Sequence, residues 1–263
     1  MQYKDFLKNL TDLEKIALEN EIQLVKKLDY ESHDINLYIN SEIELNTRTI
    51  SYRKEPEIIR WIEGNFKKIK NPVFYDIGAN IGAYSLVASK YCNQKIKTYS
   101  FEPSFLNFYQ LNRNILLNEC EGSIVPLCLA LSSQNKLGNF NFSDLNTGSA
   151  AHAFGEAIGE TGERFQPEKI SKMQCFKLDD LIEICNFERP NFMKIDVDGL
   201  EMEIIKGSEK ILSSDSLKSI VVEIVYEEDA EEFTNFLSQF GFKFESKHPY
   251  TGKSPGFNFI YSK

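Results

Sequence analysis

From residue 73 onward, apolar runs with the length of buried strands alternate with segments whose apolar residues recur at helical spacing. The strand-like runs are 73–77, 96–102, 124–131, 192–196 and 219–225. Strands that alternate with helices in this way predict a parallel, doubly wound α/β sheet with helices on both faces. A last amphipathic helix should stop at Gly241, and two further strands, 242–246 and 257–261, are expected to close the sheet as an antiparallel pair.

The N-terminal part follows a different pattern. Leucines at helical spacing among charged residues predict an accessory helix over 1–28, which would pack on the core or on a second copy of the chain. Alternating residues in 35–52 favour short strands. Pro56 suits the first turn of a helix with an apolar stripe. We therefore expect an N-terminal accessory extension, 1–52, and one domain, 53–263.

The periodicity is interrupted after the third predicted strand. Residues 137–143 alternate like an antiparallel strand, but 143–172 carry four glycines and little periodicity. A connection of this length inside a compact domain is typical of a functional or disordered segment. We interpret 143–172 as a lid-like insertion on the substrate side.

Composition narrows the functional classes. The chain has 263 residues, a net charge of −9 and a pI near 5.1, and this acidity argues against an open nucleic-acid platform. No apolar run approaches membrane-spanning length, and the N-terminus lacks the apolar region of a signal peptide. The five scattered cysteines form no C-x-x-C pair, so we expect buried free thiols in a reducing cytoplasm rather than disulfides or a zinc site.

The first candidate site is the turn that follows the strand 73–77. Asp76, Gly78, Asn80 and Gly82 lie where this strand ends and a helix begins, so backbone can approach a ligand closely there. A dinucleotide fingerprint would have glycine in place of Asn80. The carboxylate of Asp76 would repel a pyrophosphate but suits a cationic ligand such as S-adenosylmethionine, which has an ammonium, a sulfonium and no phosphate. The alternative is an ordinary tight strand-to-helix turn.

A second acid supports a nucleoside ligand. Glu102 ends the next strand, near the separation (roughly 20 residues) at which a βαβ unit places an acid on a ribose. A carboxylate can accept hydrogen bonds from both ribose hydroxyls. The alternative is a solvated acid at a strand end.

The segment 194–201 carries a further acidic cluster. Asp196 and Asp198 follow the fourth strand, and ligands of open α/β sheets gather at the carboxyl ends of strands. Two acids this close can share a cation, hold a substrate hydroxyl or raise one another's pKa, and each of these would help to deprotonate an alcohol. The alternative for Asp198 and Glu201 is helix capping. A divalent metal is possible at Asp196 and Asp198, but two carboxylates do not specify one.

Two more residues are candidates for catalysis. Glu223 is a lone carboxylate in an apolar strand, which is costly unless it is paired or borders a site. His152 lies in the insertion and could act as a general base near neutral pH, although a loop histidine is more often structural.

Taken together, these motifs resemble the FkbM-type family of S-adenosylmethionine-dependent methyltransferases over roughly residues 53–225. The resemblance rests on the strings FYDIGANIGAYS, SFEPSFLNFYQLNRNILLN, CLALS, FKLDDL and MKIDVDGLEMEIIKG. It implies a class I methyltransferase fold, a Rossmann-like seven-stranded sheet that is mostly parallel with one antiparallel strand near the end. One departure is Asp198, where the family more often has glutamate.

The resemblance also implies roles for individual residues. Asp76, Gly78 and Asn80 would surround the methionine part of S-adenosylmethionine, with Gly82 in the same turn. Glu102 would hold the ribose, Ala130 and Leu131 would border the adenine, and Asp196 would face the methyl-transfer site. Family members methylate hydroxyl groups of sugars, polyketides or other secondary metabolites, so a sugar or glycan hydroxyl is the expected acceptor.

Other functions remain as alternatives at this stage. A nicotinamide-dependent oxidoreductase would carry the G-x-G-x-x-G turn that this chain lacks. An amino-methyltransferase of nucleic acids would carry an Asn/Asp-Pro-Pro-Tyr/Phe loop where this chain has Asp-Val-Asp-Gly. Methyl transfer to an amine or a protein, or a non-catalytic partner protein that keeps the nucleoside pocket, is also open. A homodimer through the N-terminal region is a further expectation.

Overall fold

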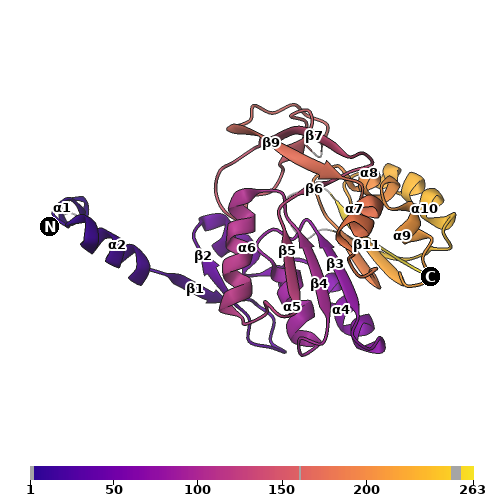
Figure 1. Ribbon diagram of the computed structural model, residues 1–263, viewed down its shortest axis with the longest axis horizontal. Coiled ribbons are helices and arrows are strands. Elements are labelled where there is room, and N and C mark those ends of the chain that lie inside the picture. Colours follow the sequence, from indigo (N-terminus) through magenta and orange to yellow (C-terminus); the bar gives the residue numbers. More distant parts are fainter. Residues whose placement is uncertain (1–2, 160, 250–255) are drawn as a thin grey trace.

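The computed structural model describes residues 3–159, 161–249 and 256–263. Its centre is a seven-stranded sheet with the strand order β12-β13-β11-β10-β3-β4-β5 (Figure 1). β13 runs antiparallel to both of its neighbours, and the other six strands share one direction. The predicted mostly parallel sheet is therefore confirmed. Its strands are β3 (Val73–Ile77), β4 (Lys97–Phe101), β5 (Ile124–Leu127), β10 (Phe192–Ile195), β11 (Ser219–Ile224), β12 (Lys243–Pro249) and β13 (Phe257–Ser262).

Helices cover both faces of this sheet, because successive strand residues point to opposite sides. Phe74 packs with α4, α5 and α6 in one core cluster, whereas Tyr75 packs with α7 to α10 in another. Both faces are apolar, as expected for parallel strands buried between two helical layers. The helices are α4 (Pro56–Asn65), α5 (Ala83–Tyr91), α6 (Phe105–Leu117), α7 (Leu178–Cys185), α8 (Glu201–Lys206), α9 (Glu209–Leu212) and α10 (Ala230–Ser238), with short turns η2 (Phe66–Lys68) and η3 (Glu227–Asp229).

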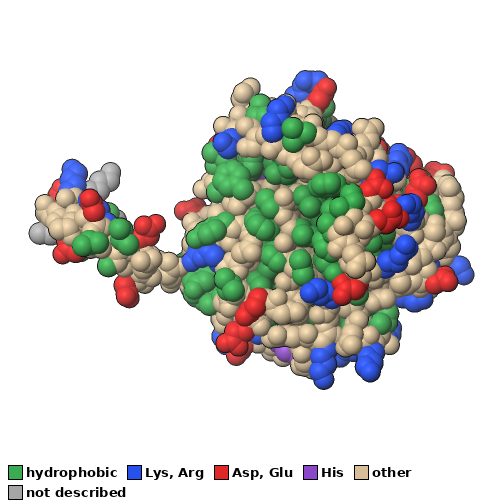
Figure 2. All heavy atoms as spheres, viewed as in Figure 1, with side chains coloured by type: hydrophobic (Ala, Val, Ile, Leu, Met, Phe, Trp, Pro, Cys, Tyr) green, Lys and Arg blue, Asp and Glu red, His purple; other side chains and the backbone are tan. Residues whose placement is uncertain are grey.

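The N-terminal segment differs from the prediction. The helix expected over 1–28 is two helices, α1 (Tyr3–Lys8) and α2 (Asp12–Glu21), followed by strand β1 (Leu24–Lys27). No residue of α2 is buried, and the segment projects away from the body with apolar side chains exposed (Figures 1 and 2). The helical period fails after Glu21 because the following residues pair in register with β2 (Asn36–Ile39).

The segment 35–52 is also only partly strand. β2 covers its start, but η1 (Glu44–Arg48) and α3 (Ser51–Lys54) are helical. The Ser41 hydroxyl oxygen accepts a hydrogen bond from the Glu44 backbone N–H at 3.1 Å and so caps the first helical turn. The helix predicted from Pro56 is confirmed.

The insertion after β5 forms a second, four-stranded sheet of order β6-β9-β7-β8. Its strands are β6 (Ala130–Leu131), β7 (Lys136–Phe142), β8 (Ala153–Phe154) and β9 (Lys169–Phe176). The single strand predicted over 124–131 is thus wrong, because the chain leaves the central sheet after Leu127 and pairs Ala130 and Leu131 with the end of β9. The lid function of 143–172 and the domain boundary at residue 52 stay predictions.

Two features bear on the cellular setting. No helix in the part of the chain that the structure describes is long and apolar enough to cross a membrane. All five cysteines are free thiols, but Cys128 and Cys185 are exposed, so the expectation that all are buried is wrong for these two. The cytoplasmic location stays a prediction.

Candidate active site

The glycine turn packs directly against the end of β10. Gly78 has φ +81°, and a Cβ there would lie 1.7 Å from the backbone oxygen of Asp196. Only glycine permits this approach, which brings the ends of β3 and β10 together. Gly82 has φ +93° and faces Leu111 of α6, so it serves helix packing rather than the cavities described next.

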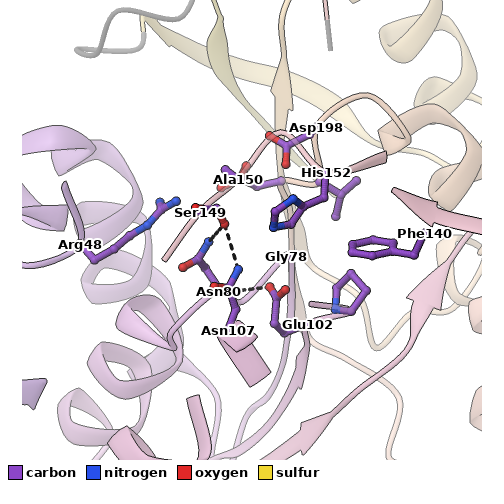
Figure 3. Close-up of a pocket in the computed structure, with 13 residues that line it drawn as sticks. Arg48, Gly78, Asn80, Glu102, Asn107, Phe140, Ser149, Ala150, His152 and Asp198 are labelled. Carbon is purple, nitrogen blue, oxygen red and sulfur yellow. Dashed lines mark hydrogen bonds between the residues drawn. The ribbon is translucent and has the colours of Figure 1, made fainter. Parts of the chain in front are cut away.

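Two adjoining cavities open at the carboxyl ends of β3, β4 and β10. The first, which we call the main cleft, has about 510 Å³ of open space (Figure 3). Its wall includes Arg48, Gly78, Asn80, Glu102, Asn107, Ser149, His152, Asp196 and Asp198. The second, the apolar cavity, is lined by Phe101, Pro103, Leu129, Ala130, Leu131 and Phe140, among others, and shares Gly78, His152 and Val197 with the cleft. Pro103 and Phe140 are also shared.

Glu102 lies in the main cleft as predicted from its strand-end position. Its carboxylate accepts hydrogen bonds from the backbone N–H groups of Asn80 at 2.8 Å and Ser104 at 2.9 Å. Each oxygen keeps a second acceptor site for a ligand hydroxyl. Burial raises the pKa of Glu102 to about 7, although the two backbone bonds oppose this shift.

Asp76 does not line either cavity. Its carboxylate is fully buried between β3 and α5, where it accepts a hydrogen bond from the Ser85 hydroxyl at 2.5 Å. Lys194 is its register neighbour on β10, and the Lys194 Nζ lies 4.0 Å from Asp76 Oδ1. Burial raises the pKa of Asp76 despite this cation. Asp76 therefore supports the floor of the cleft from beneath rather than reaching into it.

Asp196 is the acid of this network that faces the main cleft. Its Oδ2 is 2.7 Å from the buried Lys194 Nζ, so this lysine forms an ion pair with it. Burial acts to raise the pKa of Asp196, but the Lys194 charge and hydrogen bonds from Glu223 and Lys194 outweigh it, so the pKa lies below its usual value. Asp196 is therefore ionised and a weak proton acceptor.

Glu223 lies behind Asp196 and lines neither cavity. Burial, followed by the charge of Asp196, raises the pKa of Glu223 well above its usual value. This shift favours the protonated form of Glu223, which can donate a hydrogen bond to the ionised Asp196. This pairing explains how a carboxyl group is accommodated in an apolar strand.

Asp198 occupies a strained position at the mouth of the cleft. It has φ +59°, and its Oδ2 accepts a hydrogen bond at 2.7 Å from the backbone N–H of Ala151, which itself has φ +60°. Left-handed non-glycine residues are uncommon and cluster at functional sites. This bond ties the insertion to the end of β10.

His152 is suited to donate a hydrogen bond rather than to accept a proton. Its Nδ1 accepts a hydrogen bond from the Ser143 backbone N–H at 3.3 Å, so the neutral ring carries its proton on Nε2. Burial lowers the pKa of His152 to about 4. The imidazole is therefore neutral near pH 7, the form that a general base needs, but its Nδ1 lone pair is already engaged and its lowered pKa makes it a weak base. The role of His152 as general base stays a prediction.

The roof of the cleft joins Asn80 to four residues that the sequence analysis did not single out: Arg48, Asn107, Gly148 and Ser149. The Ser149 carbonyl accepts hydrogen bonds from the side-chain amides of Asn80 at 3.0 Å and Asn107 at 2.9 Å (Figure 3). The Gly148 carbonyl accepts from Arg48 Nε at 2.9 Å and Nη2 at 2.7 Å. Asn107 lies in the first turn of α6, and no local sequence pattern marks Arg48 as a site residue.

A metal centre has no support from this geometry. Among the residues described, no group of three or more His, Cys, Asp or Glu side chains is placed to hold a metal ion. Asp196 and Asp198 both face the cleft, but the Lys194 ammonium already occupies one oxygen of Asp196.

Comparison with known proteins identifies this arrangement. Residues 76–244 match the Methyltransferase FkbM domain, which covers both acidic strand ends and the insertion. The chain belongs to the FkbM methyltransferase family. It is therefore an enzyme, an S-adenosylmethionine-dependent methyltransferase, as the resemblance predicted.

The chain is similar to individual methyltransferases over segments much longer than the glycine turn. The chain is 28% identical over 188 residues to the hexuronic acid methyltransferase AglP of Haloferax volcanii, covering 71% of this chain and 69% of that protein. It is 29% identical over 161 residues to the methyltransferase sdnD of Sordaria araneosa, covering 52% of this chain and 60% of that one. The crystal structure of an FkbM methyltransferase from Methylobacillus flagellatus superposes with a TM-score of 0.53 at 15% identity, covering 76% of this chain and 45% of that one. This FkbM methyltransferase therefore has the class I methyltransferase fold.

Proposed function

We propose that this FkbM methyltransferase transfers a methyl group from S-adenosylmethionine to a hydroxyl group of a sugar, glycan or secondary metabolite. One observation carries the proposal: Glu102 and the ionised Asp196 line the same cleft, and an apolar cavity adjoins it. Glu102 suits the ribose of this cofactor, and the ionised Asp196 suits its cationic methionine part. The apolar cavity suits its adenine.

The cofactor would lie across both cavities. Glu102 would accept hydrogen bonds from the ribose hydroxyls, and Ala130 and Leu131 would pack on the adenine in the apolar cavity. Gly78 and Asn80 would face the methionine part, whose ammonium suits the fixed negative charge of Asp196. Asp76 would act indirectly, by holding Lys194 in place.

When bound, the cofactor supplies a methyl group already activated on a sulfonium. The protein has to align an acceptor oxygen behind that methyl group and exclude water. It also has to take the hydroxyl proton. Asp196 is a weak base because of Lys194, the raised pKa of Glu223 favours its protonated form, and His152 is a weak base whose Nδ1 is engaged. We therefore assign the proton-accepting role to Asp198.

The acceptor is proposed on the basis of a relative. AglP is described as a hexuronic acid methyltransferase, so a carbohydrate hydroxyl is the class of acceptor that the comparison supports. The acidic net charge of −9 disfavours a nucleic-acid acceptor.

The test is calorimetric titration with S-adenosylmethionine, its demethylated product and NAD. We expect binding of the first two alone. Glu102→Ala should weaken binding about 10- to 100-fold, the range for loss of hydrogen bonds to a charged group. Glu121→Ala, an exposed acid beyond the opposite end of β5, is the matched control and should bind as wild type. Tighter binding of NAD, or equal affinity of both variants, would refute the cofactor assignment.

A second measurement tests the proton acceptor. Asp198→Asn should lower kcat about 10²- to 10⁴-fold, the usual contribution of a general base, and leave cofactor affinity unchanged. Activity retained by this variant, with and without a chelator, would remove Asp198 from the mechanism.

A further inference from the structure

A third cavity adjoins the main cleft on the side of η1 and α3. We call it the polar pocket; it has about 340 Å³ of open space. The two cavities share Arg48, Gly78, Asn80 and Asp196. The match to the FkbM domain begins at residue 76, so the wall that η1 and α3 contribute lies outside the matched segment. A ligand group that reaches Asp196 in the main cleft therefore also meets residues that the family match does not include.

The cations of the polar pocket differ in whether an acid already pairs with them. Those that the structure describes are Arg48, Lys54 and Lys194. The Lys194 Nζ is 2.7 Å from Asp196 Oδ2, and the Lys54 Nζ is 3.4 Å from Glu55 Oε2. Arg48 forms no ion pair with any acid in the part of the chain that the structure describes. Of these cations, Arg48 is therefore the one whose charge is left for a ligand.

The hydrogen bonds of Arg48 use only one edge of its guanidinium. Nε and Nη2 donate to the Gly148 carbonyl at 2.9 Å and 2.7 Å. Nη1 donates to none of the described residues, so the edge formed by Nη1 and the second N–H of Nη2 is open to an acceptor. Burial is the main cause of the pKa shifts of Glu102 and His152, but the Arg48 charge also acts to lower both pKa values. The guanidinium charge is thus felt inside the main cleft.

The position of Arg48 is fixed by close packing between η1 and the insertion. Gly148 has φ +80°, and a Cβ there would lie 2.6 Å from the Cγ of Glu44, the first residue of η1. The Arg48 carbonyl accepts a hydrogen bond from the Ser51 hydroxyl at 2.9 Å. The side chain reaches from η1 towards Ser149 at the roof of the cleft (Figure 3). A guanidinium held in this way loses little conformational freedom when an anion binds.

The proposed cofactor brings an anion to this wall. The carboxylate and the ammonium of its methionine part are attached to the same carbon atom. An ammonium beside Asp196 therefore keeps the carboxylate next to the wall that the main cleft and the polar pocket share. An arginine edge with two parallel N–H donors matches the two oxygens of a carboxylate.

We propose that Arg48 binds the methionine carboxylate of S-adenosylmethionine, so that η1 completes the cofactor site from outside the matched domain. This rests on the proposed function and deepens it. The carboxylate accepts hydrogen bonds from Nη1 and Nη2, while the opposite edge of the guanidinium keeps its bonds to the Gly148 carbonyl. The same arginine then holds both the insertion and the cofactor.

The experiment is calorimetric titration with two ligands, S-adenosylhomocysteine and the same compound without its carboxylate. Wild type should bind the first about 10- to 100-fold more tightly, the range for hydrogen bonds to a charged group. Arg48→Met should bind the two ligands nearly alike, because only the first loses affinity. Arg48→Lys keeps the charge without the paired donors and should restore part of the difference. Arg113→Met is the matched control, since Arg113 is also half-buried but lines neither cavity, and it should match wild type.

The two ligands separate this proposal from the proposed function. A wild type that bound neither would defeat the proposed function itself. With the first ligand bound, equal affinity for both in wild type would overturn the Arg48 assignment alone. Equal weakening of both ligands in Arg48→Met would also overturn it, because the arginine would then only support the insertion. The remaining source of a carboxylate is the acceptor. Unchanged affinities in Arg48→Met, with KM raised only for oligosaccharides that carry hexuronic acids, would likewise overturn the assignment.

Discussion

Substitution of Gly78 by alanine tests the contact that brings β3 and β10 together. The added Cβ would stand 1.7 Å from the Asp196 backbone oxygen, well inside van der Waals contact, so one of the two backbone segments has to move. Overpacking of this kind costs about 1–3 kcal/mol. The left-handed φ of +81° adds about 1–2 kcal/mol for any residue with a Cβ. We expect Gly78→Ala to lower the free energy of unfolding by about 2–5 kcal/mol, the sum of these two costs.

The chain offers a matched control in Gly241. Its φ is +85°, and a Cβ there would meet no atom within 4 Å. Gly241→Ala should therefore show the conformational cost alone, about 1–2 kcal/mol. Urea unfolding followed by circular dichroism measures both variants, and the difference between them isolates the contact with Asp196. Calorimetry below the unfolding transition should also show lost cofactor binding only in Gly78→Ala. Equal destabilisation of the two variants, with cofactor binding retained in both, would refute the reasoning.

Three further outcomes follow from the site and the N-terminal segment. Cofactor affinity should rise as the pH rises through about 7, because burial raises the pKa of Glu102 to about 7 and the ionised carboxylate is the better acceptor of hydrogen bonds from the ribose. Calorimetry at several pH values should find that Glu102→Gln has lost this pH dependence. Lys194→Met should destabilise the protein by about 3–5 kcal/mol, because Asp196 and Asp76 lose their shared cation; an unchanged urea midpoint would contradict this. Removal of residues 1–22 should leave the melting temperature within a few degrees, since α2 buries nothing, and light scattering before and after the truncation tests the predicted homodimer.

The sequence predicted the site best where an acidic residue falls at the end of a predicted parallel strand. Glu102 and Asp196 were recognisable because acids at the ends of predicted parallel strands meet at one edge of a sheet. The same reasoning could not tell which face Asp76 would point to. Both faces of β3 are apolar, so its pattern does not show that the Asp76 carboxylate turns towards α5 and away from the cleft.

Local sequence patterns could not predict contacts between segments that lie far apart in the chain. Arg48 is bonded to a carbonyl 100 positions further along the chain, and neither segment has a periodicity that predicts the other. The helix predicted over 1–28 failed for a related reason, because the pairing of β1 with β2 overrides the leucine spacing. The state of His152 likewise depends on the Ser143 N–H and on burial, which only the folded chain provides.

The two ends of the insertion lie side by side, since β6 pairs with the end of β9 through Ala130 with Cys175 and Leu131 with Phe176. Neighbouring strands are about 4.8 Å apart, so the chain leaves and re-enters the catalytic body at nearly one point. We therefore expect that the segment between these ends can be exchanged as a unit. Grafting the corresponding stretch of another family member between Leu131 and Cys175 should change the part of the main cleft that Ser149 and His152 line, while β3, β4 and β10 keep their places.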